Sequence, residues 1–88
     1  MMPLEQRLER AHTAQDEELW TLVRDTHPQV ILNATLNRSL TEEMALFLAK
    51  ARKTPAEALG VLAGDIRFKE SYKLKLALCI NPKTPPRV

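Results

Sequence analysis

The segment that most constrains the fold is residues 68–80, where the pattern predicts a helix with two apolar flanks. One stripe at helical spacing comprises Phe68, Tyr72, Leu76, Cys79 and Ile80, and a second comprises Leu74, Ala77 and Leu78. A helix that is apolar around most of its circumference must be covered on two sides. We therefore expect this helix to be central in the domain, or covered by something beyond it, with Leu76 in the core.

Helix-start signals occur five more times upstream. Pro3 and Pro28 suit the first turn of a helix, and the acidic residues 16–18 suit the positive end of a helix dipole. Thr41 and Thr54 are predicted N-cap residues. Glycine, which β-hairpins and phosphate-binding loops need, occurs only twice in the chain. The sequence therefore predicts an all-α fold of five or six short antiparallel helices.

The length and the cysteine content indicate one domain in a reducing compartment. Eighty-eight residues can form a single core without disulfides. Cys79 has no second cysteine to pair with, and we expect it to be buried on an apolar helix face. No apolar stretch approaches the roughly 20 residues that cross a bilayer, and the charged N-terminus does not resemble a secretion signal. We expect a cytoplasmic protein with no membrane partner.

The chain contains a faint internal repeat. Thr41, Thr54 and Thr84 can be aligned as helix caps, each preceded at ten residues by the start of an apolar segment, namely Ile31, Met44 and Leu74. Thr84 follows Thr41 by 43 residues, which lies within the period of about 40–47 residues of HEAT and armadillo repeats. This spacing favours stacked helical hairpins.

The residues that carry a family resemblance are Asn81-Pro82-Lys83-Thr84-Pro85-Pro86, which follow the helix that contains Ala77. This stretch resembles bacterial leucine-rich-repeat-variant and HEAT-like helical repeats, in which a helix ending in Ala-x-x-x-Asn-Pro is followed by Thr-Pro at the start of the next. Thr54-Pro55 resembles the opening of such a unit. The resemblance is best over residues 41–86 and implies a right-handed α-solenoid fragment that contacts macromolecules. We divide the single predicted domain into residues 1–26, N-terminal cap helices that depart from the repeat pattern, and residues 27–86, repeat-like helices. It implies no cofactor, since the sequence lacks a cysteine cluster for iron–sulfur binding.

In such repeats, residues 84–88 would begin another helix. Because each unit of a solenoid buries its face on the next, an end without a polar cap needs a neighbour. We therefore hypothesise that the exposed flank of the predicted helix 68–80 packs against a second copy or against the rest of a longer chain.

Residues suited to catalysis or metal binding are sparse. His12, Asp16 and His27 are expected to be ordinary surface residues, because zinc needs three or four converging ligands. Ser39 and Ser71 have no evident base, and the sequence contains neither a glycine-rich phosphate loop nor a His-Glu-x-x-His motif. We expect a protein that is not an enzyme.

The charge distribution suggests the surface that binds a partner. Residues 1–44 carry four basic and eight acidic groups, whereas residues 45–88 carry nine basic and three acidic groups. The candidate partner-binding residues are Lys50, Arg52, Lys53, Arg67, Lys69, Lys73 and Lys75. Lys69 and Lys73 are four residues apart and are expected to share a helix face.

Three readings of this basic half remain open: an acidic protein partner, the phosphates of a nucleic acid, and an ordinary solvated edge. Nucleic acid is less favoured, because only Tyr72 lies among the cations and no arginine cluster is present. Trp20 and Phe47 are expected in the core. We expect a non-catalytic protein-interaction or scaffold module whose partner is another protein or a second copy, with a nucleic-acid-binding helical domain as the alternative.

Overall fold

The fold is all-α, as predicted. The structure is a computed structural model that describes residues 3–84, and within this range it contains helices and no strand. The elements are α1 (Leu4–Thr13), α2 (Asp16–Val23), α3 (Pro28–Thr35), α4 (Glu42–Lys50), α5 (Ala56–Ala63), the 3₁₀ turn η1 (Ile66–Phe68) and α6 (Tyr72–Ile80). None of the described helices has both the length and the apolar character that crossing a membrane requires.

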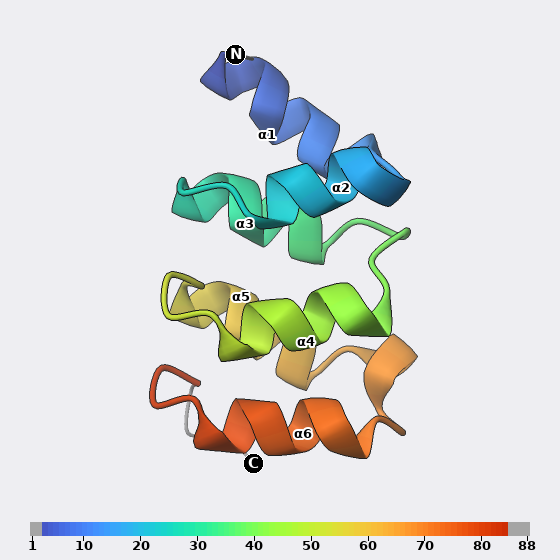
Figure 1. Cartoon of the computed structure of the whole chain (residues 1–88), viewed down its shortest axis with the longest axis vertical. Coiled ribbons are helices and arrows are strands. Elements are labelled where there is room, and N and C mark those ends of the chain that lie inside the picture. The colour runs from blue at the N-terminus through green and yellow to red at the C-terminus, as the bar shows by residue number, and fades with distance from the viewer. Residues whose placement is uncertain (1–2, 85–88) are drawn as a thin grey trace.

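The helices form two columns along the long axis of the molecule. Helices α2, α4 and α6 follow one another in one column, and α1, α3 and α5 follow one another beside it (Figure 1). The molecule is elongated, with principal extents of 37 × 21 × 16 Å. Helices α1 and α6 therefore lie at opposite ends.

The hydrophobic core lies between the two columns. Every α-helix contributes at least one apolar side chain that is at most 1% exposed, including Ala11, Leu19, Ile31, Leu48, Leu59 and Leu74. Trp20 is half-buried, and its ring meets that of Phe47 edge to face with 6.0 Å between centroids. Phe47 is partly exposed, so of these two predicted core residues neither is fully buried.

Two of the helices begin at hydroxyl caps. The side chain of Thr41 accepts a hydrogen bond from the main-chain N–H of Met44, and that of Ser71 accepts one from Leu74. Thr54 does not cap α5, contrary to the prediction. Its fully buried hydroxyl instead donates to the carbonyl oxygen of Leu48 over 2.6 Å. This carbonyl lies in the last turn of α4, where it also accepts a hydrogen bond from the main-chain N–H of Ala51.

The predicted helix over residues 68–80 is divided in two. The carboxylate of Asp65 accepts a hydrogen bond from the main-chain N–H of Arg67 and starts η1, whereas Ser71 starts α6. Phe68 and Lys69 therefore precede α6, and Lys69 does not share a helix face with Lys73. The expected i, i+4 relationship between these two lysines was wrong.

Only one flank of α6 is buried. Leu74, Ala77 and Leu78 face the core, as the second predicted stripe required. Of the first stripe, only Phe68, which precedes α6, is buried. Its members on α6 are exposed: Tyr72, Leu76 and Ile80 are 75%, 48% and 73% exposed, and Cys79 is exposed as well. The expectations that Leu76 lies in the core and that Cys79 is buried were wrong. Both α4 and α5 contact α6, and both lie on the same side of it (Figure 1).

Along one edge of the molecule, side chains join successive loops to one another. The amide of Asn37 donates to the carbonyl oxygens of Ala11 and Ala14 over 2.9 and 2.8 Å. The guanidinium of Arg67 donates to the carbonyl oxygens of Thr35 and Asn37 over 3.1 and 2.8 Å. The acceptors are main-chain carbonyls at helix ends and in loops, where intrahelical donors run out. The carbonyl oxygen of Asn37 accepts a second hydrogen bond, from the main-chain N–H of Leu40.

Two lysines join loops in the same way along the opposite edge. The ammonium of Lys53 donates to the carbonyl oxygen of Arg24, and that of Lys83 donates to the carbonyl oxygen of Arg52. Lys53 follows α4 and Lys83 follows α6, and each reaches back to the preceding loop of its column. The same kind of contact therefore occurs twice along this edge.

Candidate protein-binding surface

Helices α4 and α6 correspond to each other in length and in the type of N-cap. Each has nine residues and each follows a hydroxyl cap, which is Thr41 for α4 and Ser71 for α6. When the two helices are aligned on these caps, every residue of α4 has a counterpart at the same position in α6. This correspondence shows which face of α6 has no neighbouring helix among residues 3–84.

The face that α4 turns toward α6 is marked by three residues spaced i, i+3 and i+7. The carboxylate of Glu42 accepts a hydrogen bond from the hydroxyl of Ser71, and Ala45 and Ala49 are both fully buried. The carbonyl oxygen of Ala49 also accepts a hydrogen bond from the amide of Asn81 over 2.7 Å. The small side chains of the two alanines let α6 pack closely.

The counterparts of these three residues on α6 are Tyr72, Lys75 and Cys79, and all three are exposed. Leu76 and Ile80 lie beside them on the helix and are exposed as well. We refer to these five residues as the outer face of α6. It is the position at which a further helix would pack if the column continued.

The opposite end of the molecule carries a polar face. On α1, Leu8 and Ala11 turn toward the rest of the molecule, and Leu4 in the first turn is 36% exposed. The other exposed residues of α1 are polar: Glu5, Gln6, Glu9, His12 and Thr13. The two ends of the molecule therefore differ in chemistry. The exposed surface of α1, at the end of one column, is mainly polar and acidic, whereas the exposed surface of α6, at the end of the other column, is apolar and basic.

A groove of about 670 Å³ opens next to the outer face, between the C-terminal ends of α4 and α6. It is lined by Ala49, Lys50, Arg52, Ala77, Ile80, Asn81, Pro82 and Lys83. Two helices present their carboxyl ends here, where the helix dipole is negative, so the nearby cations partly compensate helix ends. Ile80 belongs to both the groove and the outer face and makes them continuous.

The seven predicted partner-binding residues do not form one patch. Lys50 and Arg52 line the groove together. Lys73 and Lys75 are exposed on α6, and Lys69 is exposed just before it. Lys53 instead reaches the carbonyl of Arg24, as described above.

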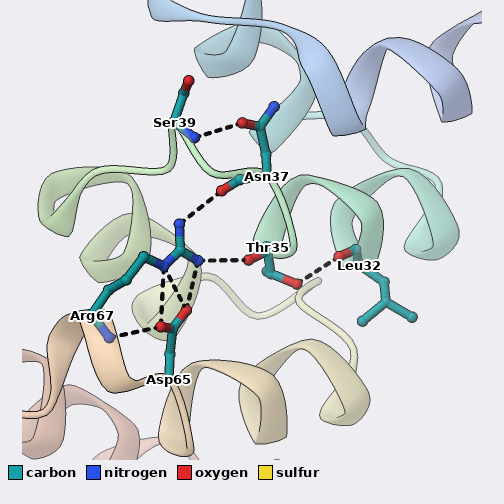
Figure 2. A network of polar contacts seen from close by, with 6 residues as sticks. All are labelled: Leu32, Thr35, Asn37, Ser39, Asp65 and Arg67. Carbon is teal, nitrogen blue, oxygen red and sulfur yellow. Dashed lines mark hydrogen bonds and ion pairs between the residues drawn. The ribbon is translucent and has the colours of Figure 1, made fainter.

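Arg67 is held within the structure by a network of polar contacts (Figure 2). Its guanidinium forms an ion pair with Asp65 at 2.6 Å in addition to its bonds to Thr35 and Asn37. The hydrogen bond from Arg67 lowers the pKa of Asp65 below its usual value, and burial opposes this only in part. With its donors occupied in this way, Arg67 contributes little to a surface for a partner.

Sequence reasoning missed Asn81 and Lys83 as part of the groove. Lys83 holds the same position after Ser71 as Lys53 holds after Thr41, and this signal was hidden because the repeat was aligned on threonines alone. That alignment equated Thr54, which bonds back to α4, with the true cap Thr41.

No group of three or more histidine, cysteine, aspartate or glutamate side chains converges as a metal site within residues 3–84. Comparison with known proteins gave no match to any family model, to any curated protein or to any solved structure.

Proposed function

We propose that this chain is a short, non-catalytic α-solenoid of the HEAT-like kind that binds other proteins through the outer face of α6. The observation that carries the proposal is the exposure of Tyr72, Leu76 and Ile80 in a single i, i+4, i+8 row on a terminal helix. Exposed apolar side chains that are contiguous, with charged residues around them, are typical of protein–protein contact sites.

The solenoid part of the proposal is supported by the two columns and by the contacts that recur along them. In solenoids each unit contacts mainly its neighbours, and the end units need polar faces or partners. Here α1 offers a polar face and α6 does not. Because α4 and α6 occupy equivalent positions, the repeat length along the chain is the separation between their caps, Thr41 and Ser71. This repeat is shorter than the separation between Thr41 and Thr84 that the alignment of threonines suggested. The segment 85–88, where another helix was expected to continue, lies outside the described residues.

The positions and hydrogen-bond partners of the cationic side chains favour a protein partner over the alternative, a nucleic acid. Phosphate binding draws on many cations directed at one strand or groove. In this molecule Lys53 and Arg67 are engaged with main-chain carbonyls. The other predicted cations are divided among the groove (Lys50 and Arg52), the first half of α6 (Lys73 and Lys75) and the segment before α6 (Lys69). Apolar side chains, which phosphates do not recognise, lie between them.

The proposal can be tested by capture of proteins from a nuclease-treated extract of the native host. The immobilised chain is compared with Leu76→Asp and with the control Leu36→Asp, which places the same charge at a residue that is 51% exposed on another part of the surface. We expect a protein that the wild type and the control both retain and that Leu76→Asp loses. Equal capture by all three forms would contradict the proposal, as would capture that nuclease treatment abolishes.

A further inference from the structure

The outer face of α6 differs from the corresponding face of α4 at one decisive position. Where α4 presents the fully buried Ala45 to its neighbour, α6 presents Lys75. A helix that packed on α6 as α6 packs on α4 would have to cover this lysine. Covering an ammonium group is unfavourable unless an opposite charge accompanies it.

The rest of the outer face requires apolar contacts. Leu76 and Ile80 are one helical turn apart, and Tyr72 lies one turn before them, so a matching surface needs apolar side chains with the same spacing. Lys73 stands beside this row and adds a second positive charge. The surface is therefore an apolar row bordered by two ammonium groups.

From this combination we infer that the partner binds the outer face of α6 with an amphipathic helix whose apolar stripe is flanked by carboxylates. The inference rests on the proposed function and names the chemistry of the partner. The apolar stripe covers Leu76 and Ile80, and the flanking carboxylates meet Lys73 and Lys75. An amphipathic helix laid on an apolar surface is a common mode of peptide recognition, read by anchors at i, i+3/i+4 and i+7.

A second copy of the chain fits this surface less well. Two α6 helices placed face to face would bring Lys73 and Lys75 toward the lysines of the other copy, and like charges repel. The exposed side of α1 offers the carboxylates of Glu5 and Glu9, but it presents no apolar row to meet Leu76 and Ile80. Neither arrangement satisfies both the charge and the apolar requirement.

The test uses three synthetic peptides that share an alanine-rich background long enough to form an isolated helix in water. The acidic peptide has leucines at i, i+4 and i+7 flanked by glutamates, and the basic peptide has the same leucines flanked by lysines. The scrambled peptide has the composition of the acidic one without the leucine stripe. Binding to the full chain is measured by fluorescence anisotropy at about 0.1 M salt, where charges within a Debye length of about 10 Å still interact.

We expect the acidic peptide to bind at least about tenfold more tightly than either of the others, because only it meets both requirements. Lys75→Glu should weaken its binding about fivefold or more and should strengthen that of the basic peptide. Leu76→Asp should weaken it about tenfold or more, since this change places a charge in the apolar row. Arg38→Glu, a charge reversal at an exposed loop residue, should leave the binding of all three peptides unchanged.

Two outcomes would overturn the inference. The first is equal binding of the acidic and basic peptides, and the second is binding of the acidic peptide that Lys75→Glu does not change. The proposed function would remain intact in either case if capture of a protein still depended on Leu76. A dimer that forms on concentration and is abolished by Leu76→Asp would also overturn it, since the occupant would then be a second copy. Preferential binding of single-stranded DNA with a steep salt dependence would overturn both proposals.

Discussion

The guanidinium of Arg67 donates a hydrogen bond to the carbonyl oxygen of Asn37 over 2.8 Å, across a chain separation of 30 residues (Figure 2). Asn37 in turn donates to Ala11 and Ala14, so one edge of the molecule is held by a continuous series of side-chain bonds to main-chain carbonyls. The loops along this edge are thereby fixed relative to one another without strand pairing or disulfides. The expected effects of mutation at this edge depend on these bonds.

Arg67→Lys should lower the free energy of unfolding by about 1–3 kcal/mol, because a lysine lacks the planar fork that serves two carbonyls and a carboxylate at once. Chemical denaturation followed by circular dichroism measures this change. Lys69→Ala, two residues away and exposed, is the control and should change stability by less than about 0.5 kcal/mol. Equal stability of Arg67→Lys and the wild type would show that the network of Figure 2 contributes little.

Asn37→Asp should destabilise the fold by about 2–4 kcal/mol, because a buried amide donor is lost. The side chain is 2% exposed, and the substitution replaces an N–H₂ group that faces two carbonyl oxygens with an oxygen that cannot donate. Thermal denaturation should therefore show a clear drop in Tm. Asn33→Asp is a useful comparison, because Asn33 donates only one such bond, to Leu8, and the smaller loss should give a smaller drop. The reverse order of the two variants would contradict this account.

Stability should fall on the acid side of the pH range. The pKa of Asp65 is lowered chiefly by its hydrogen bond from Arg67. For Asp25, burial raises the pKa, but hydrogen bonds from the main chain of His27 and from Arg7 lower it more, so the net direction is down. The unfolded chain, with ordinary aspartate pKa values near about 3.9, then binds more protons than the folded chain.

The stabilisation is therefore complete above about pH 5 and is lost as the pH falls through the lowered pKa values of the folded state. The free energy of unfolding, measured by urea denaturation from about pH 7 to about pH 2.5, should decline mainly below about pH 4. Asp65→Asn should be less stable at neutral pH and should show a shallower acid decline. The exposed Glu57→Gln serves as the control for loss of one carboxylate. An acid decline that is identical in Asp65→Asn and the wild type would argue against a role for this ion pair.

Leu74→Asp and Leu76→Asp should behave in opposite ways, although they lie two residues apart. Leu74 is 1% exposed, so a carboxylate there is buried without a partner and should unfold the domain, at a cost of about 3–5 kcal/mol. Leu76 is 48% exposed, and its substitution should leave cooperative melting intact with a change below about 1 kcal/mol. Unfolding of both variants would mean that the outer face of α6 is covered in solution.

The local signals in the sequence predicted the all-α class and most helix starts, but not the division of the predicted helix 68–80 or the cap of α5. Proline in the first turn of α3 and the hydroxyl of Thr41 act only on main-chain groups a few residues away, so their effect is readable from the sequence. The same holds for the inner stripe of α6, because Leu74 and Leu78 are fixed on one face by the period of the helix. The candidate surface was predicted only in part, since Lys73 and Lys75 were identified but were grouped with cations that lie elsewhere.

What the sequence determined by itself is therefore the helices, most of their starts and the apolar character of both flanks of α6. Only the tertiary structure decided which flank is covered, because α4 and α5 lie on the same side of α6 (Figure 1) and leave Tyr72, Leu76 and Ile80 exposed. Only the tertiary structure, likewise, assigned Arg67 to the interior network, since its main-chain partners lie in a distant part of the chain. The physical reason is the range of the interactions: caps and periodicity act within a helical turn, whereas burial and long-range hydrogen bonds depend on where the loops place distant segments.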